Sequence, residues 1–258
     1  MIRQPARRRD ALRKHLSIAA AIGCAAVIAA CTSSTKGSPS NGSSAPGSGS
    51  STSVADLKAS VQQAMQAATS FHMVGNGADD SGKPIQFDIH FGQHQAAGSI
   101  VQDGLKIELI NPGGQSVYFR APDSLWQQEG GAAAVALFHG KWVKVPTDDA
   151  RFSGLTKSFD KDSFVSQMMS ASGSSSDSDL HKVGPATVDG TPAIKYRSES
   201  DHAELYVAAN GAPVIVKIVD PSSNGGALMF TEYGKGYPVT APPDSQTVDF
   251  AKLEGNHH

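Results

Sequence analysis

The chain of 258 residues has only two cysteines, Cys24 and Cys31, and both lie near the N-terminus. Disulfide bonds or a multi-cysteine zinc site therefore cannot hold a folded domain together. Aromatic residues make up only 7% and charged residues 18% of the chain, but 39% of the residues are hydrophobic. That is enough apolar material for one domain of about 200 residues that folds by packing alone.

Common catalytic motifs are also lacking: the sequence contains no G-x-S-x-G, no H-E-x-x-H and no G-x-x-x-x-G-K-[ST]. His90 and His94 are four residues apart, but Gly92 between them indicates the end of a strand, where this spacing does not bring two imidazoles together. We therefore expect no catalytic residue, no metal site, no cofactor and no enzymatic activity. A hydrolase without these motifs is a third hypothesis behind the two given below.

Excess positive charge is confined to the N-terminus. Six of the 22 basic residues lie within the first 30 positions, together with a single acidic residue, Asp10. The remaining chain has 16 basic and 23 acidic residues, a net charge of -7. Such a chain repels phosphate backbones, so we do not expect nucleic acid as a partner.

The N-terminus has the pattern of a bacterial lipoprotein signal. A basic stretch over residues 1–15 precedes the uncharged apolar run 16–30, which is shorter than the ~20 residues of a membrane span. Residues 28–31 read Ile-Ala-Ala-Cys, a lipobox in which small residues permit cleavage and the cysteine sulfur receives a diacylglycerol. We expect acylated Cys31 to anchor the chain on the extracytoplasmic face of the cell membrane. An unmodified cysteine at the end of a membrane helix is the alternative.

The segment after Cys31 has nothing to bury. Residues 32–53 are mostly Ser, Gly, Thr and Pro, with one charge at Lys36 and no large apolar side chain. As a flexible coil this segment spans about 25 Å. The predicted organisation is a signal peptide over residues 1–30, a lipidated cysteine and tether over 31–53, and one folded domain over 54–258.

Hydrophobic periodicity predicts a helix followed mainly by strands. Ser53 is the expected cap of a helix over residues 54–69, in which apolar residues recur every three or four positions. Apolar and polar residues then alternate over 85–91 and 105–109, as in strands with one apolar face. Further strands are predicted over residues 115–120, 141–145, 180–188, 191–199, 203–208, 213–219 and 227–233, and short helices over 122–128, 132–138 and 161–170. The short turns between them indicate an α+β fold, a curved antiparallel half-barrel of about ten strands with helices on its concave face.

The concave face of such a sheet requires apolar filling. Candidate residues lining a cavity there are Ile85, Phe87, Ile89, Phe91, Leu105, Ile107, Leu109, Val117, Phe119, Trp126, Phe164 and Met168. The short middle helices either complete the core or leave a cavity. A cavity lined in this way stays dry and accepts acyl chains, each buried methylene contributing about 0.8 kcal/mol.

Several short motifs in order resemble a known family. They are Gly-Lys-Trp-Val at 140–143, Val-Asp-Gly-Thr-Pro at 188–192, and the hairpin from Leu-Tyr-Val-Ala at 205–208 to Gly-Ala-Pro at 211–213. With the lipobox and tether, they are similar to the actinobacterial LppX/LprG lipoproteins and their LolA-like relatives, over residues 54–250. The resemblance implies a U-shaped half-barrel that binds lipids or lipidated glycans in a hydrophobic cavity and moves them between envelope layers.

Two functions are thus open. The first is a membrane-anchored envelope lipoprotein that binds lipid or lipidated glycan and carries or chaperones it. The alternative is an envelope interaction module with a filled core, which binds a protein partner through its outer surface.

Overall fold

The computed structural model of the chain describes residues 53–78, 82–171, 179–221 and 225–255. The predicted signal peptide, Cys31 and almost all of the tether therefore lie outside the described residues. Among the helices of the described part, none combines the length and the apolar character that crossing a membrane requires.

The first helix, α2 (Val54–Ala67), confirms the prediction from the apolar stripe. The Ser53 hydroxyl accepts a hydrogen bond of 3.1 Å from the backbone N–H three residues later and so caps the helix. Leu57, Val61 and Met65 form the buried side of α2. Helix α2 therefore docks through the one face that its sequence makes apolar.

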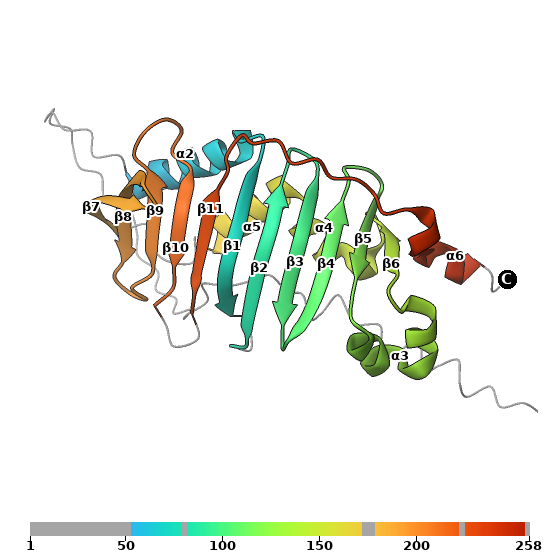
Figure 1. The fold of residues 1–258 in the computed structure, drawn as a ribbon. Coiled ribbons are helices and arrows are strands. Elements are labelled where there is room, and N and C mark those ends of the chain that lie inside the picture. Colours follow the sequence, from blue (N-terminus) through green and yellow to red (C-terminus); the bar gives the residue numbers. More distant parts are fainter. Residues whose placement is uncertain (1–52, 79–81, 172–178, 222–224, 256–258) are drawn as a thin grey trace, which may run out of the picture.

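The strands that follow form a single twelve-stranded sheet (Figure 1). They are β1 (Phe71–Ala78), β2 (Pro84–Phe91), β3 (Ala96–Gln102), β4 (Leu105–Asn111), β5 (Ser116–Arg120), β6 (Trp142–Pro146), β7 (Leu180–Val188), β8 (Thr191–Ser198), β9 (Glu204–Ala208), β10 (Ile215–Val219), β11 (Ala227–Thr231) and β12 (Thr247–Asp249). The order in the sheet is β12-β6-β5-β4-β3-β2-β1-β11-β10-β9-β8-β7. All neighbouring pairs are antiparallel except β12 with β6. The predicted curved antiparallel sheet is confirmed, although the predicted number of about ten strands is too low.

The join between β1 and β11 brings the two halves of the chain into one sheet. These strands pair antiparallel, with Met73 opposite Phe230. The segment 232–246 then runs back along the strand ends and places β12 beside β6, at the far edge (Figure 1). Strands that precede and follow the helical middle of the chain therefore form one continuous sheet.

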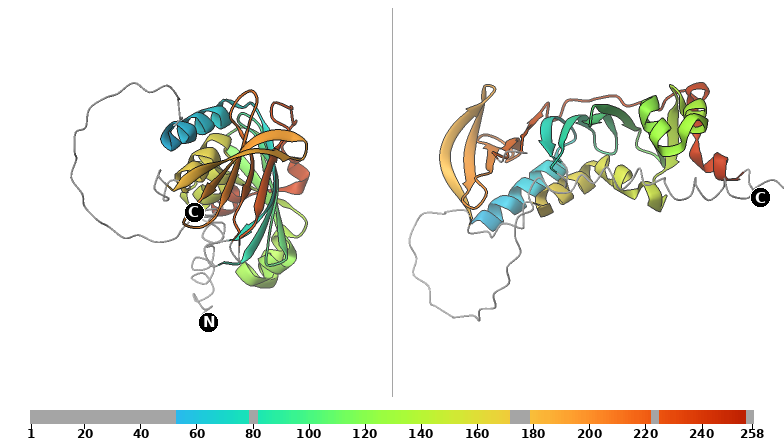
Figure 2. Two further views of the ribbon diagram at one scale, coloured as in Figure 1. Left: turned by 90° about the vertical axis from the view of Figure 1, so that its left-hand side faces the viewer. Right: turned by 90° about the horizontal axis from the view of Figure 1, so that it is seen from below.

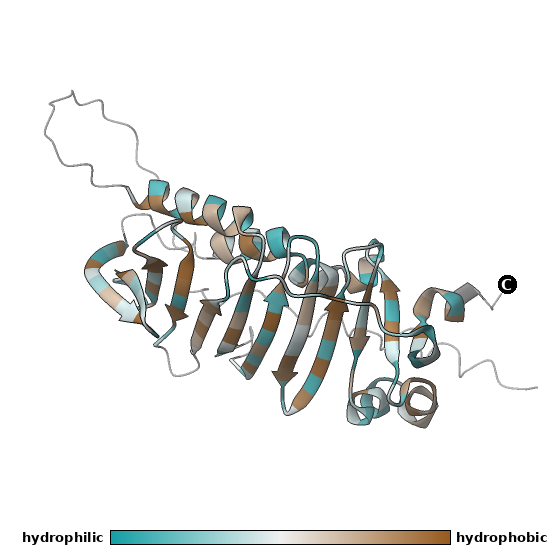
Figure 3. Cartoon of the chain, turned by 45° about the horizontal axis from the view of Figure 1, so that its top comes forward, coloured by the Kyte–Doolittle hydropathy of each residue, from teal (hydrophilic) through white to brown (hydrophobic). Residues whose placement is uncertain are grey.

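Hydrophobic and hydrophilic positions alternate along the central strands, as Figure 3 shows. The register brings the apolar positions of neighbouring strands together: Phe91 lies opposite Phe71 on one side and Ala96 on the other. Likewise, Leu109 lies opposite Gly98 and Phe119. Because side chains alternate between the two faces, these rows all belong to the concave face of the sheet.

Three helices cover this concave face (Figure 2). They are α2, α4 (Ser153–Ser158) and α5 (Lys161–Ala171). Asp160 caps α5, because its carboxylate accepts a hydrogen bond of 2.8 Å from the backbone N–H of Ser163. Helices on the concave face are as predicted, whereas α4 is an addition.

The remaining helices lie towards the β6 edge. Helix α3 (Asp123–Phe138) has a kink at Gly131, whose φ of 65° is left-handed. The two short helices predicted there are thus present and are joined at this glycine, which adopts the conformation without the penalty of a side chain. Short 3₁₀ turns over Ala150–Phe152 and Asp244–Gln246 and helix α6 (Phe250–Gly255) complete the described elements.

Candidate functional site

Nine of the twelve side chains predicted to line a cavity lie on the concave face of β2, β4 and β5, and the other three lie on helices α3 and α5. Most of them are nearly inaccessible, with exposed fractions of 9% or less: Ile85, Phe87, Ile89, Phe91, Leu109, Val117, Phe119 and Trp126. The other four are half-buried: Leu105, Ile107, Phe164 and Met168. The predicted residues therefore divide into a closed centre of eight side chains and four half-buried ones.

The helices close the centre by direct packing. Phe91 has no accessible surface, and its ring stacks on Phe164 of α5 with the centroids 4.9 Å apart. The Tyr233 hydroxyl donates a hydrogen bond to the backbone carbonyl oxygen of Ile215 and lies 3.1 Å from the sulfur of Met65 in α2. Burial raises the pKa of Tyr233, so this hydroxyl stays neutral. A side chain without accessible surface lines no space that admits a water molecule, so Phe91 itself is closed off by the covering helix.

Trp126 supports the β6 end of the core. Its indole Nε1 donates a hydrogen bond of 3.2 Å to the backbone carbonyl oxygen of Ala121. Its ring lies 4.5 Å from that of Phe138 and 5.9 Å from that of Phe119. Trp126 thus joins the two halves of α3 to β5, with its polar atom satisfied.

Further along the concave face, the covering is less complete. Tyr196, Leu205 and Ile218 are direct cross-strand neighbours on β8, β9 and β10, and all three are half-buried. Each packs against the main core through part of its surface. We call these three residues the apolar margin. They share a cross-strand row with Leu228 of β11, so the margin continues directly into the core.

Half-buried apolar residues also occur on β4 at the other side of the closed centre. Ile107 lies opposite Ile100, and Leu105 lies opposite Gln102 at the start of the strand. Leu109, two residues after Ile107 on the same face, is only 2% exposed. The helices therefore cover one end of β4 more completely than the other.

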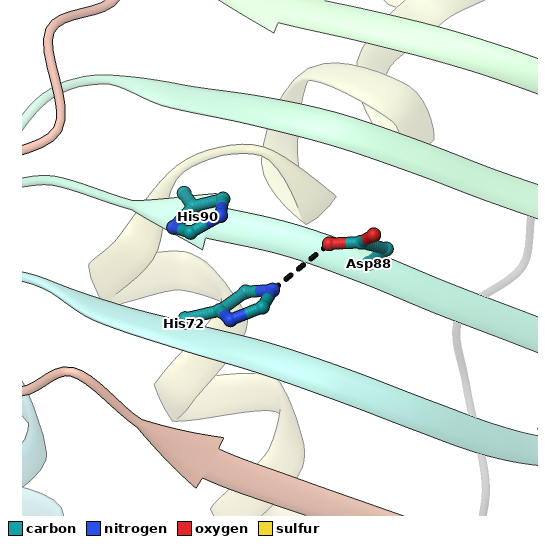
Figure 4. Close-up of side chains that lie close together, drawn as sticks. All are labelled: His72, Asp88 and His90. Carbon is teal, nitrogen blue, oxygen red and sulfur yellow. Dashed lines mark hydrogen bonds and ion pairs between the residues drawn. The ribbon is translucent and has the colours of Figure 1, made fainter.

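The convex face carries a polar arrangement that no prediction included. His72 of β1 and His90 of β2 are cross-strand neighbours, and their rings stack with centroids 3.8 Å apart and planes inclined by 4°. Asp88 precedes His90 by two residues on the same face, and its Oδ1 lies 2.8 Å from Nε2 of His72 (Figure 4). The other face of His90 stacks on Tyr237 at 4.1 Å.

Within this cluster, the pKa of His90 is lowered from its ordinary value. Burial is the main cause that lowers the pKa of His90, and the neighbouring His72 lowers it further. The carboxylates of Glu232 and Asp88 oppose this shift. Among the described residues, the grouping of His72, Asp88 and His90 could hold a metal ion. His94, four residues after His90, does not belong to this grouping.

A shallow depression of about 450 Å³ adjoins the cluster on the convex face. Its lining mixes apolar, polar and charged side chains from β1 to β4: Val74, Asn76, Gln86, Asp88, Ser99 and Lys106. Asp88 belongs to both features. The depression is open to solvent, and Phe87 is the one residue of the predicted lipid-lining set that contributes to its lining.

Comparison with known proteins gives structural neighbours only. No family model matches this chain, and no curated protein matches it. LprF from Mycobacterium bovis is similar at 13% identity and a TM-score of 0.49, covering 73% of this chain and 96% of that one. The lipoprotein LppX from Mycobacterium tuberculosis is similar at 13% identity and a TM-score of 0.42, covering 72% and 98%.

A third neighbour is MucB in the Pseudomonas aeruginosa MucA/MucB complex, with 16% identity and a TM-score of 0.31, covering 75% of this chain and 59% of that one. At these identities and TM-scores the neighbours identify no ligand and no partner for this chain.

Proposed function

We propose that this chain is a membrane-anchored envelope lipoprotein that binds the acyl chain of a lipid or lipidated glycan without catalysing a reaction. The observation that carries the proposal is the apolar margin of Tyr196, Leu205 and Ile218 on the concave face. These side chains are aligned across three strands, and the protein's own helices cover them only in part. The binding energy would come from burying methylene groups at about 0.8 kcal/mol each.

The closed centre changes where the ligand binds. A deep central cavity lined by the whole predicted set does not fit side chains such as Phe91, which has no accessible surface. Binding at the margin instead leaves part of the ligand exposed. Neighbouring strands are about 4.8 Å apart, so three aligned residues contact roughly 10 Å of an acyl chain. The headgroup then lies outside the sheet, where a donor or acceptor can reach it.

The anchor supports a role in carrying lipid. The lipobox at residues 28–31 predicts acylation of Cys31, and a tether of about 25 Å lets the domain approach a membrane-bound donor without detaching. We infer that the domain shields the acyl chain of a cargo lipid while the lipid passes between envelope layers.

The test uses chain 32–258, purified without detergent from a bacterial host and examined by native mass spectrometry and organic extraction. The expected result is a co-purified lipid, which Leu205→Glu removes because it places a carboxylate in the margin. Val74→Glu is the matched control, since Val74 is 37% exposed on the convex face of β1. Circular dichroism establishes that both variants remain folded. A clean apo mass for the wild type, or equal loss of lipid in the two variants, contradicts the proposal.

A second function is favoured by the closed centre. With the core filled, the outer surface of the same domain can serve as an envelope interaction module for a protein partner. A transfer assay distinguishes the two functions. It measures whether the domain moves fluorescent phospholipid from donor to acceptor vesicles. Transfer at the rate of vesicles alone supports the interaction module.

A further inference from the structure

We propose that His72, Asp88 and His90 form a binding site for a divalent transition-metal ion, with Zn²⁺ as the reference ion, on the convex face of the sheet. Each residue offers one ligand atom, and these atoms all lie within 4.8 Å of one another. Two imidazoles and one carboxylate are donors typical of zinc, copper and nickel sites. Magnesium and calcium prefer sites built only from oxygen atoms, so the donor set selects against them.

The strand geometry explains why these three side chains converge. Asp88 and His90 are two residues apart on β2 and point to the same face, and His72 lies directly opposite His90 on β1. Both strands lie in the interior of the twelve-stranded sheet, so their backbones are held on both sides. The three ligands therefore start from fixed positions, and only their side chains need to adjust.

The cluster is accessible to an ion from solvent. The side chains of His72 and His90 are 20% and 23% exposed, and that of Asp88 is 64% exposed. Three protein ligands leave one tetrahedral position for water or a small ligand, which the depression beside Asp88 can accommodate. This is the arrangement of an open metal site.

Metal binding requires a defined rearrangement. A tetrahedral zinc ion with bonds of about 2.0 Å places two of its ligand atoms roughly 3.3 Å apart. The present separation of 2.8 Å between Nε2 of His72 and Oδ1 of Asp88 must widen, with the metal replacing the shared proton. The parallel rings of His72 and His90 direct their lone pairs side by side, so one ring must turn. Binding should therefore break the stacking between these rings.

Glu232 is placed to support the site from outside. Its Oε2 lies 3.8 Å from Nδ1 of His90, beyond hydrogen-bonding distance, and the turn of the ring that metal binding requires would have to bring Nδ1–H to this carboxylate while Nε2 takes the metal. A carboxylate on the second nitrogen of a ligating imidazole fixes its tautomer and orientation. Removing such a partner typically weakens metal binding by about 10–100-fold.

The experiment titrates the full chain, purified in detergent, with Zn²⁺ in competition with a chromophoric chelator. Compared with the wild type, His72→Gln and His90→Gln should each bind one zinc ion fewer. Glu232→Gln should keep this zinc ion but bind it with an affinity lower by at least about tenfold. Glutamine keeps a polar side chain of similar length, and circular dichroism verifies the fold. The histidine NMR resonances of the wild type should shift as the rings unstack.

The chain supplies a matched control. His139 and Asp123 also form a pair with 2.8 Å between Nδ1 and the carboxylate oxygen, but among the described residues they belong to no group of three ligands. His139→Gln should therefore retain the full zinc stoichiometry. Unchanged zinc binding in both His72→Gln and His90→Gln would overturn the proposal, and so would an equal loss in His139→Gln.

Discussion

The side-chain amide of Asn111 donates a hydrogen bond of 2.9 Å to the backbone carbonyl oxygen of Phe159. Asn111 is a buried residue at the end of β4, and Phe159 lies at the junction of α4 and α5. The side-chain oxygen of Asn111 also accepts a hydrogen bond from the backbone N–H of Gly113. One polar residue thus ties the sheet to the helices that close its concave face.

Replacing Asn111 with alanine should lower the free energy of unfolding by about 1–3 kcal/mol, because the buried Phe159 carbonyl loses its partner. Urea denaturation followed by circular dichroism measures the change. Asn210→Ala, in the exposed turn before β10, is the control and should stay within about 0.5 kcal/mol of the wild type. Equal effects of the two substitutions would refute this role.

Gly98 of β3 should not tolerate even a methyl group. A Cβ atom at this position would clash with the backbone carbonyl oxygen of Asp88 and lie 2.6 Å from Cα of Ile89. Since both obstacles are backbone atoms of β2, the sheet itself would have to move. We expect Gly98→Ala to cost at least about 1–3 kcal/mol in urea denaturation. Gly114→Ala is the control, because no atom lies within 4 Å of that Cβ position.

The two ends of β4 should differ in their response to a larger side chain. Leu109 is 2% exposed, so Leu109→Trp should destabilise the domain by about 1–3 kcal/mol through overpacking. Ile107 is half-buried on the same face, and Ile107→Trp should have a smaller effect on stability. Thermal and urea unfolding of the two variants test this difference. A larger cost for Ile107→Trp would show that the helices pack tightly against this end too.

The stabilisation that Glu204 gives the domain through Lys195 should be lost in acid. The Lys195 ammonium, 2.6 Å away, is the main cause that lowers the pKa of Glu204 below the usual value of a glutamate, about 4.5. For an acid with a depressed folded-state pKa, the stabilisation is present above the unfolded-state pKa and is lost as the pH falls through the folded-state value. The advantage of the wild type over Glu204→Gln should therefore disappear progressively below about pH 4.5.

Urea midpoints measured at several pH values between 3 and about 7 would follow this loss. Glu199→Gln provides the comparison, because the Glu199 side chain is 78% exposed at the end of β8. A constant difference between the wild type and Glu204→Gln across this range would contradict the assigned cause.

Strong local patterns made α2 and β2 predictable. Helix α2 carries apolar residues at helical spacing behind a serine cap, and β2 alternates strictly between apolar and polar side chains. Strand β1 escaped prediction because Gly75 and Gly77 interrupt its apolar face. Strand β3 begins with Ala-Ala-Gly-Ser, which carries little hydrophobic signal, and β12 has only three residues. These strands form because the neighbouring strands supply the missing partners.

The histidine cluster could not be found without the strand register. Sequence spacing directed attention to His90 and His94, whereas the partner of His90 is His72, eighteen positions earlier and across a strand boundary. The sequence also could not show which of the predicted lining residues are closed off and which are half-buried. Whether Leu109 or Ile107 is covered depends on where α4 and α5 end, and alternation along β4 carries no information about that.

The parallel pairing of β12 with β6 has a consequence for biosynthesis. Until residues 247–249 pair with it, β6 is an edge with unsatisfied backbone groups. The folding domain thus remains open to pairing with other chains at this edge until β12 docks. A premature stop codon before Thr247 should therefore favour aggregation of the product, even though eleven strands would already have been made.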